Sequence, residues 1–145
     1  MNYKDFLKID RGCPFCNFDF KKLIKEESDA ILTYALAPYT NYHLLITPKR
    51  HVESFEDLEK KERESIDRLL NNGIKLLKVL GHENFSILLR NGEIIGKSVK
   101  HLHYHIIPSI EVGSLNNNSI ERNIMTEEEI DKLLEDFKKA ELELK

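Results

Sequence analysis

Three histidines occupy alternate positions of one short apolar segment: His101, His103 and His105 lie within KHLHYHIIP at residues 100–108. The residues between and after them are leucine, tyrosine and isoleucine, and a proline ends the run, which favours a strand over a helix. Successive side chains of a strand point to opposite faces, so we expect the three imidazoles on one face and their neighbours in a core. The sequence thus predicts a sheet that gathers three polar rings on one side.

The length and charge of the chain indicate what kind of protein it is and which partners it is expected to lack. Its 145 residues are 41% hydrophobic, which predicts one globular domain over residues 1–145. A net charge of −3 with intermixed signs does not provide the basic surface that nucleic-acid binding needs. The N-terminal MNYKDFLKID has no apolar core of a signal peptide, and no run of about 18 apolar residues occurs. We therefore expect a cytoplasmic protein with neither a nucleic-acid nor a membrane partner.

Hydrophobic periodicity and turn residues predict an α+β fold with an antiparallel sheet. The patterns Ser54 with Asp57 and Thr126 with Glu129 resemble capping boxes at the starts of two amphipathic helices. The last two strands are expected to form an antiparallel hairpin. The predicted strands are 31–37, 42–48, 84–91 and 98–107, the helices are 56–80 and 126–143, and residues 112–123 are expected to form a flexible loop.

Both cysteines lie in one motif, Cys13-Pro-Phe-Cys16. Two thiolates separated by two residues can reach one ion, so the motif is a common half of a zinc site. The alternative is a pair of buried or redox-active cysteines. The other ligands of a metal site would come from the histidine triplet or from the remaining histidines, His43, His51 and His82.

The triplet itself has three chemical uses. The imidazoles can bind a catalytic metal ion, they can supply a nucleophile and its proton-transfer partners, or they can make structural hydrogen bonds. Burial of three unpartnered polar rings would cost several kcal/mol, and an apolar side chain would fill the space at less cost. This disfavours the structural use, but residue type and spacing do not separate the other two.

The run His101-Leu-His103-Tyr-His105-Ile-Ile-Pro108 matches the signature of the histidine-triad (HIT) family of nucleotide hydrolases and transferases. Three further stretches resemble that family in the expected order, so the resemblance covers roughly residues 13–108. They are the CxxC motif at 13–16, the segment 43–51 with a histidine at each end, and Asn91 followed by Gly96-Lys97-Ser98.

The resemblance implies the HIT fold, in which one long helix packs on an antiparallel sheet of about five strands and a C-terminal helix follows, usually in a homodimer. It also implies four catalytic histidines. His103 would attack the α-phosphorus of a nucleotide conjugate, and His105 would donate to the phosphate oxygens and assist the leaving group. His43 would orient the triad, and His101 would support the nucleophile as its neighbour.

In zinc-bearing members the ligands correspond to Cys13, Cys16, His51 and His101, and the resemblance implies a structural Zn²⁺ at these residues. Implied substrate contacts fall on five residues. The substrate would be a purine nucleotide conjugate, either an adenosine phosphoramidate or a dinucleoside polyphosphate. The substrate-contacting residues would be Asn91, Lys97 and Ser98 at the phosphates and Phe15 and Leu36 at the base.

The chain departs from the family pattern at several positions. Lys97 replaces a usual glutamine, Ala35 replaces an acidic or amide residue that binds ribose, and Ser109 replaces an arginine that commonly follows the proline. Three alternatives stay open: a dinucleoside polyphosphate phosphorylase, a non-catalytic zinc-stabilised nucleotide-binding module, and a metalloenzyme with the triplet as metal ligands. The sequence names neither the physiological substrate nor the acceptor.

Overall fold

The computed structural model describes residues 1–6, 8–9, 12–92, 100–110 and 122–145. The predicted phosphate contacts Lys97 and Ser98 and most of the predicted 112–123 loop lie outside these ranges. The helices are α1 (Tyr3–Phe6), α2 (Lys60–Val79) and α3 (Glu127–Glu143), with 3₁₀ turns η1 (Phe20–Lys22) and η2 (Phe55–Asp57); the strands are β1 (Lys25–Glu26), β2 (Ala30–Tyr34), β3 (Leu44–Pro48), β4 (Phe85–Leu89) and β5 (Tyr104–Pro108).

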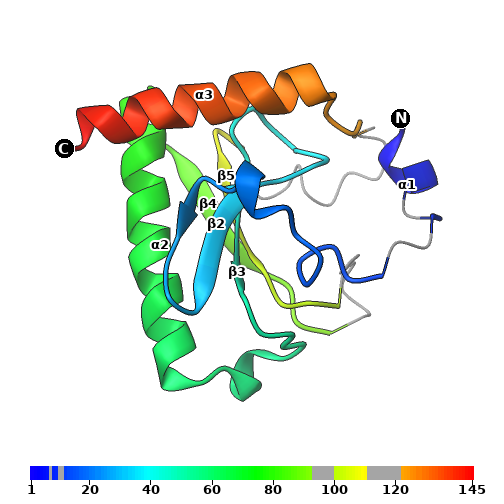
Figure 1. The fold of residues 1–145 in the computed structure, drawn as a ribbon. Coiled ribbons are helices and arrows are strands. Elements are labelled where there is room, and N and C mark those ends of the chain that lie inside the picture. Colours follow the sequence, from blue (N-terminus) through cyan, green and yellow to red (C-terminus); the bar gives the residue numbers. More distant parts are fainter. Residues whose placement is uncertain (7, 10–11, 93–99, 111–121) are drawn as a thin grey trace.

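The five strands form one antiparallel sheet in the order β1-β2-β3-β5-β4 (Figure 1). The predicted hairpin is the β4–β5 pair, in which Leu88 lies opposite His105. On the other side of β5, His105 lies opposite Leu45 of β3. This architecture confirms the predicted α+β class, with the histidine strand in an interior position of the sheet.

The histidine strand is shorter than predicted. Regular pairing begins at Tyr104, so only His105 of the triplet lies in β5. The residues before it are held by contacts outside the ladder: the Leu102 N–H donates to the Val52 carbonyl (2.6 Å), and the Thr47 hydroxyl donates to the Leu102 carbonyl (2.8 Å). The predicted alternation nevertheless persists, because Leu102 and Ile106 lie in the hydrophobic core and Tyr104 packs against it.

Strand β2 ends at Tyr34 instead of continuing to residue 37. Beyond it, backbone groups are bonded to the segment that precedes α3. The Leu36 carbonyl accepts from the Met125 N–H (2.9 Å), and the Ala37 carbonyl accepts from the Arg122 guanidinium (3.3 Å). Periodicity could not show this change, because the competing partner lies about 90 residues further along the chain.

The long helix begins later than predicted, at Lys60, after a separate 3₁₀ turn. Ser54 makes no side-chain capping bond, and Glu59 and Glu62 form the capping box in its place. Buried Glu62 fixes this start, since its carboxylate accepts from the Glu59 N–H (2.8 Å) and from the Arg50 guanidinium (2.7 Å). The second predicted box, Thr126 with Glu129, caps α3 as expected.

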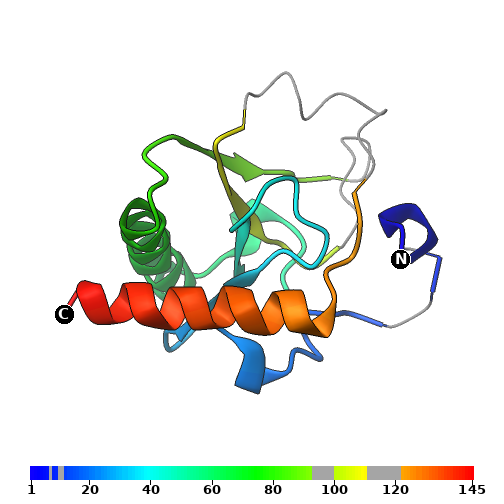
Figure 2. The same ribbon diagram turned by 90° about the horizontal axis from the view of Figure 1, so that it is seen from above.

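Helix α2 covers one face of the sheet and α3 packs against α2, whereas the N-terminal segment lies on the other side (Figures 1 and 2). Gly73 lets α2 approach the sheet closely. A Cβ atom at this position would lie 3.0 Å from Ile106 Cδ1 and 3.3 Å from Leu44 Cδ1. Of the helices in the described ranges, none has the length and apolar character needed to cross a membrane.

We predict that Gly73→Leu destabilises the fold, because its side chain would displace Ile106 and Leu44 from the packed interface. The expected loss in the free energy of unfolding is roughly 1–3 kcal/mol, in spite of a gain of about 1 kcal/mol in helix propensity. Urea unfolding measures it. The matched control is Asn71→Leu at an exposed position of the same helix, and an equal effect of both variants would contradict the close approach.

Candidate active site

The face of the sheet opposite α2 forms the floor of a cavity of about 330 Å³. Thr33, Leu45 and His105 point into it from β2, β3 and β5, as their alternation with core residues requires. His43, which immediately precedes β3, and His103, which precedes β5, complete its histidine wall. The structure therefore brings together three of the four histidines predicted to be catalytic.

A chain of hydrogen bonds fixes the proton positions of His43 and His105. The Tyr39 backbone N–H donates to His43 Nδ1 (3.2 Å). Since a neutral imidazole carries one N–H, the His43 proton lies on Nε2, which donates to His105 Nδ1 (2.8 Å). The proton of His105 must then lie on its own Nε2. His105 thus acts as a hydrogen-bond donor in the cavity.

His103 has the opposite tautomer. Its Nδ1 lies 2.8 Å from the carbonyl oxygen of His101. A carbonyl can only accept, so His103 carries its proton on Nδ1 and keeps a lone pair on Nε2. The ring lies beside those of Phe15 and His105, with centroids 5.1 Å and 4.9 Å away. An imidazole with its lone pair on Nε2, next to an N–H donor, can act as a nucleophile.

Burial keeps His43 and His105 neutral. Desolvation, followed by the positive charge of Arg122, lowers the pKa of His43 to about 3. Desolvation and then the neighbouring His43 lower the pKa of His105 to about 2. Both rings therefore retain the tautomers described above at neutral pH.

These shifts predict acid sensitivity. Below about pH 6.5 the unfolded chain binds protons at His43 and His105 that the folded chain excludes. The free energy of unfolding therefore decreases as the pH is lowered. The expected slope is about 1.4 kcal/mol per pH unit for each histidine. Urea unfolding from about pH 7 to about pH 5 should show a smaller slope in His43→Gln than in the parent chain. His82→Gln is the control, and equal slopes in His43→Gln and the parent would contradict the buried neutral state.

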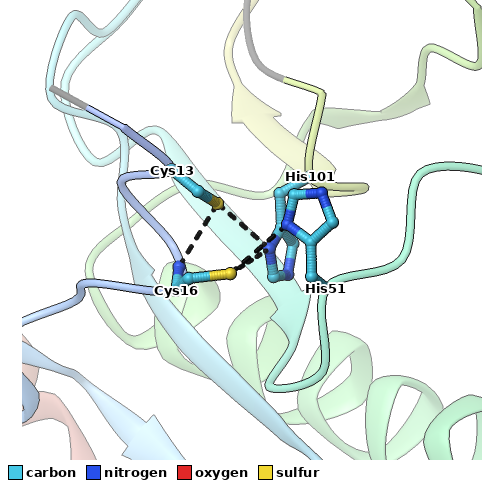
Figure 3. Close-up of side chains that lie close together, drawn as sticks. All are labelled: Cys13, Cys16, His51 and His101. Atoms are coloured by element: carbon cyan, nitrogen blue, oxygen red, sulfur yellow. Dashed lines mark hydrogen bonds between the residues drawn. The ribbon is translucent and has the colours of Figure 1, made fainter. Parts of the chain in front are cut away.

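Next to the histidine wall, four side chains from distant segments converge (Figure 3). Cys13 and Cys16 come from the N-terminal loop, His51 follows β3, and His101 precedes β5; their ligand atoms lie within 4.8 Å of one another. Cys16 Sγ is 3.3 Å from His51 Nδ1 and 3.5 Å from His101 Nδ1, and Cys13 Sγ is 3.4 Å from His101 Nδ1. This is the predicted metal-ligand set.

The cluster fits a tetrahedral zinc ion. Zn–S and Zn–N bonds of ordinary length place neighbouring ligand atoms about 3.6 Å apart, close to the separations found here. The Nε2 atom of each histidine faces an oxygen acceptor, the Pro48 carbonyl for His101 (2.7 Å) and the Glu53 carboxylate for His51 (3.1 Å). Nδ1 is then the ligating atom of each ring. Against the effect of burial, hydrogen bonds from the backbone at Cys16 lower the pKa of Cys13 and favour its thiolate.

The predicted substrate contacts have different outcomes. Phe15 and Leu36 line the cavity, and their role at the base stays a prediction. Asn91 is exposed outside the lining, and its Oδ1 accepts from the Phe55 N–H (2.7 Å). Lys97 and Ser98 fall outside the described residues.

Sequence reasoning missed much of the cavity lining, including two arginines and two aromatic side chains. Arg90 lies at the end of β4 beside the predicted contact Asn91, and that adjacency was the available signal. Tyr3 and Phe6 come from the N-terminal segment, and Arg122 comes from the segment that leads into α3. No motif or periodicity marks them, because their position depends on long-range pairing.

The chain belongs to the HIT domain family, whose family model matches residues 20–112. The Cys13, Cys16, His51 and His101 cluster fits the branch of the family with a CxxC motif.

An adenosine 5′-monophosphoramidase of Schizosaccharomyces pombe is 36% identical over 101 residues, which are 67% of this chain and 74% of that protein. Two solved structures share the fold at 19% identity. A hypothetical histidine triad nucleotide-binding protein from Sulfolobus tokodaii has a TM-score of 0.75 over 91% of this chain and 93% of its own. A zinc-bound histidine triad family protein from Mycobacterium smegmatis has a TM-score of 0.68 over 91% and 97%.

Proposed function

We propose that this chain hydrolyses purine nucleotide conjugates at the α-phosphate, with His103 as the nucleophile. The observation that carries the proposal is the hydrogen bond from His103 Nδ1 to the His101 carbonyl, which places the ring's lone pair on Nε2. The enzyme class agrees with the hydrolase names of family relatives, among them the monophosphoramidase described above.

The reaction proceeds in two displacements. In the first, the His103 Nε2 lone pair forms a bond to the α-phosphorus, and the bond from phosphorus to the leaving group breaks with its electron pair on the leaving group, which takes a proton from solvent when it is an amine. In the second, a water oxygen attacks phosphorus, the N–P electron pair returns to Nε2, and the water proton passes to solvent. His105 Nε2–H donates to the phosphoryl oxygens in both steps, because its Nδ1 is occupied by His43.

A zinc ion at the cysteine–histidine cluster would hold the site in shape and take no part in the chemistry. It would connect the N-terminal loop to His101, the residue whose carbonyl accepts a hydrogen bond from His103 Nδ1–H. The four ligand atoms and their oxygen acceptors support this assignment, as does the zinc-bound structural neighbour.

The remaining assignments complete the proposal. We assign contact with the base to Phe15 and Leu36, which lie in the cavity wall. We assign contact with phosphate to Asn91, Lys97 and Ser98. We further propose that the chain acts in the cytoplasm and, as the family resemblance implies, forms a homodimer.

Replacement of the nucleophile should abolish turnover. We expect His103→Asn to lower kcat on an adenosine phosphoramidate or a dinucleoside tetraphosphate at least about 1,000-fold, with AMP binding retained. His82→Asn, a histidine outside the cavity, is the control. Turnover by His103→Asn would contradict the proposed mechanism, and retained cellular effects would favour the non-catalytic binding module.

Loss of one thiolate should release zinc. We expect one zinc ion per chain, retained in His103→Asn and lost in Cys16→Ser, with a Tm lower by roughly 5–10 °C if the site contributes about 2 kcal/mol. Metal analysis and thermal unfolding measure these effects, and His82→Ala serves as the control. Two metal ions per chain, or loss of zinc from His103→Asn, would favour the metalloenzyme alternative.

A further inference from the structure

The N-terminal residues pair with the segment that leads into α3, and together they form one wall of the cavity. Asn2 bridges Asn123 in an antiparallel pair, the Tyr3 N–H donates to the Arg122 carbonyl (3.0 Å), and the Ile124 N–H donates to the Met1 carbonyl (2.9 Å). Both ribbon views show α1 beside the segment that leads into α3 (Figures 1 and 2). We call residues 1–6 with 122–125 the terminal wall.

The terminal wall lies outside the part of the chain that the family model matches, residues 20–112. It nevertheless contributes the side chains of Tyr3, Phe6 and Arg122 to the cavity. The histidines and the sheet supply the chemistry common to the family. A wall built from other residues is therefore where selectivity particular to this chain can arise.

Arg122 is the cation that this wall contributes to the cavity, and its position is well defined. Its Cζ atom lies 4.0 Å from the Tyr39 ring centroid and 4.3 Å from that of Tyr3, and one guanidinium nitrogen donates to the Ala37 carbonyl (3.3 Å). Tyr39 in turn stacks on His43, with centroids 5.8 Å apart and planes at 29°. The Tyr39 ring thus lies between the guanidinium and the His43–His105 pair, and the guanidinium has further N–H groups that can donate to a ligand.

The charge of the cavity lining suits an anion beyond the α-phosphate. Arg90 and Arg122 both line the cavity. Lys22 is the other described cation there and pairs with Glu127 (2.8 Å), while Asp19 is the one described acid and caps η1 through the Lys21 N–H. Two arginines and one acid leave the lining net positive toward a ligand. The planar guanidinium of arginine can donate two parallel hydrogen bonds to phosphate oxygens, and its positive charge complements theirs.

We propose that Arg122, assisted by Arg90, binds the phosphate next to the α-phosphate and so selects conjugates whose leaving group is itself a phosphate over those that release an amine. This inference rests on the proposed function. When His103 Nε2 bonds to the α-phosphorus, the P–O bond breaks with its electron pair on the leaving phosphate oxygen. The negative charge that develops on this oxygen is stabilised by the guanidinium, so the leaving phosphate does not need to be protonated.

The test compares two substrates in the parent chain and in Arg122→Gln. On diadenosine tetraphosphate, we expect Arg122→Gln to lower kcat/KM about 10- to 100-fold, as for loss of a charged hydrogen bond. On an adenosine phosphoramidate, the change should stay below about 3-fold, and Arg122→Lys should recover part of the loss on the tetraphosphate. Arg63→Gln is the matched control, since Arg63 stacks on Phe55 at 4.2 Å outside the cavity.

Equal losses on both substrates, or no loss on either, would overturn the role of Arg122. A parent chain that turns over the phosphoramidate but not the tetraphosphate would do the same. A parent chain that turns over neither would overturn the proposed function instead.

A second measurement leaves Arg122 unchanged, in case Arg122→Gln does not fold. His103→Asn should bind ADP about 10-fold more tightly than AMP, since the second phosphate reaches the guanidinium. Equal or weaker binding of ADP would contradict the proposal.

Discussion

A neutral imidazole has two nitrogens and one proton, and the site depends on where that proton lies on each ring. Backbone groups determine the tautomers of two rings. The Tyr39 N–H donates a hydrogen bond to Nδ1 of His43, and the His101 carbonyl accepts a hydrogen bond from Nδ1–H of His103. The tautomer of His105 follows from that of His43, because His43 Nε2–H donates a hydrogen bond to His105 Nδ1. The cavity consequently holds one lone pair on His103 beside one N–H donor on His105. Burial preserves this arrangement by lowering the pKa of His43 and His105 far below neutral pH.

The fold connects these proton positions to the rest of the molecule. Helix α2 packs closely on one face of the sheet at Gly73, and the apolar side chains that alternate with the histidines fill that interface. His101 then serves two purposes in one residue. Its ring belongs to the metal-ligand cluster, and its carbonyl orients His103. A metal ion at the cluster would act on catalysis through the backbone of this residue.

Local patterns predicted the parts of the structure that depend on local rules. Alternation placed His105 on the face away from the core residues of β5, and the Thr126 capping box marked the start of α3. The complete ligand set came from the family resemblance, because the CxxC motif alone left the histidine ligands open. The errors have long-range causes. Strand β2 ends early because residues near Arg122 take its carbonyls, and α2 starts late because buried Glu62 caps it. The terminal wall could not be predicted, since it is formed by pairing between the N-terminal residues and the segment that leads into α3, about 120 residues apart in the chain.

The tautomers can be observed directly by ¹⁵N NMR of the histidine rings in the zinc-loaded chain at neutral pH. Long-range nitrogen–proton spectra distinguish a protonated Nδ1 from a protonated Nε2. We expect the proton on Nδ1 in His103 and on Nε2 in His43 and His105. A His103 ring protonated at Nε2, or one whose Nε2 is bound to metal, would leave no lone pair for phosphorus and would contradict the account.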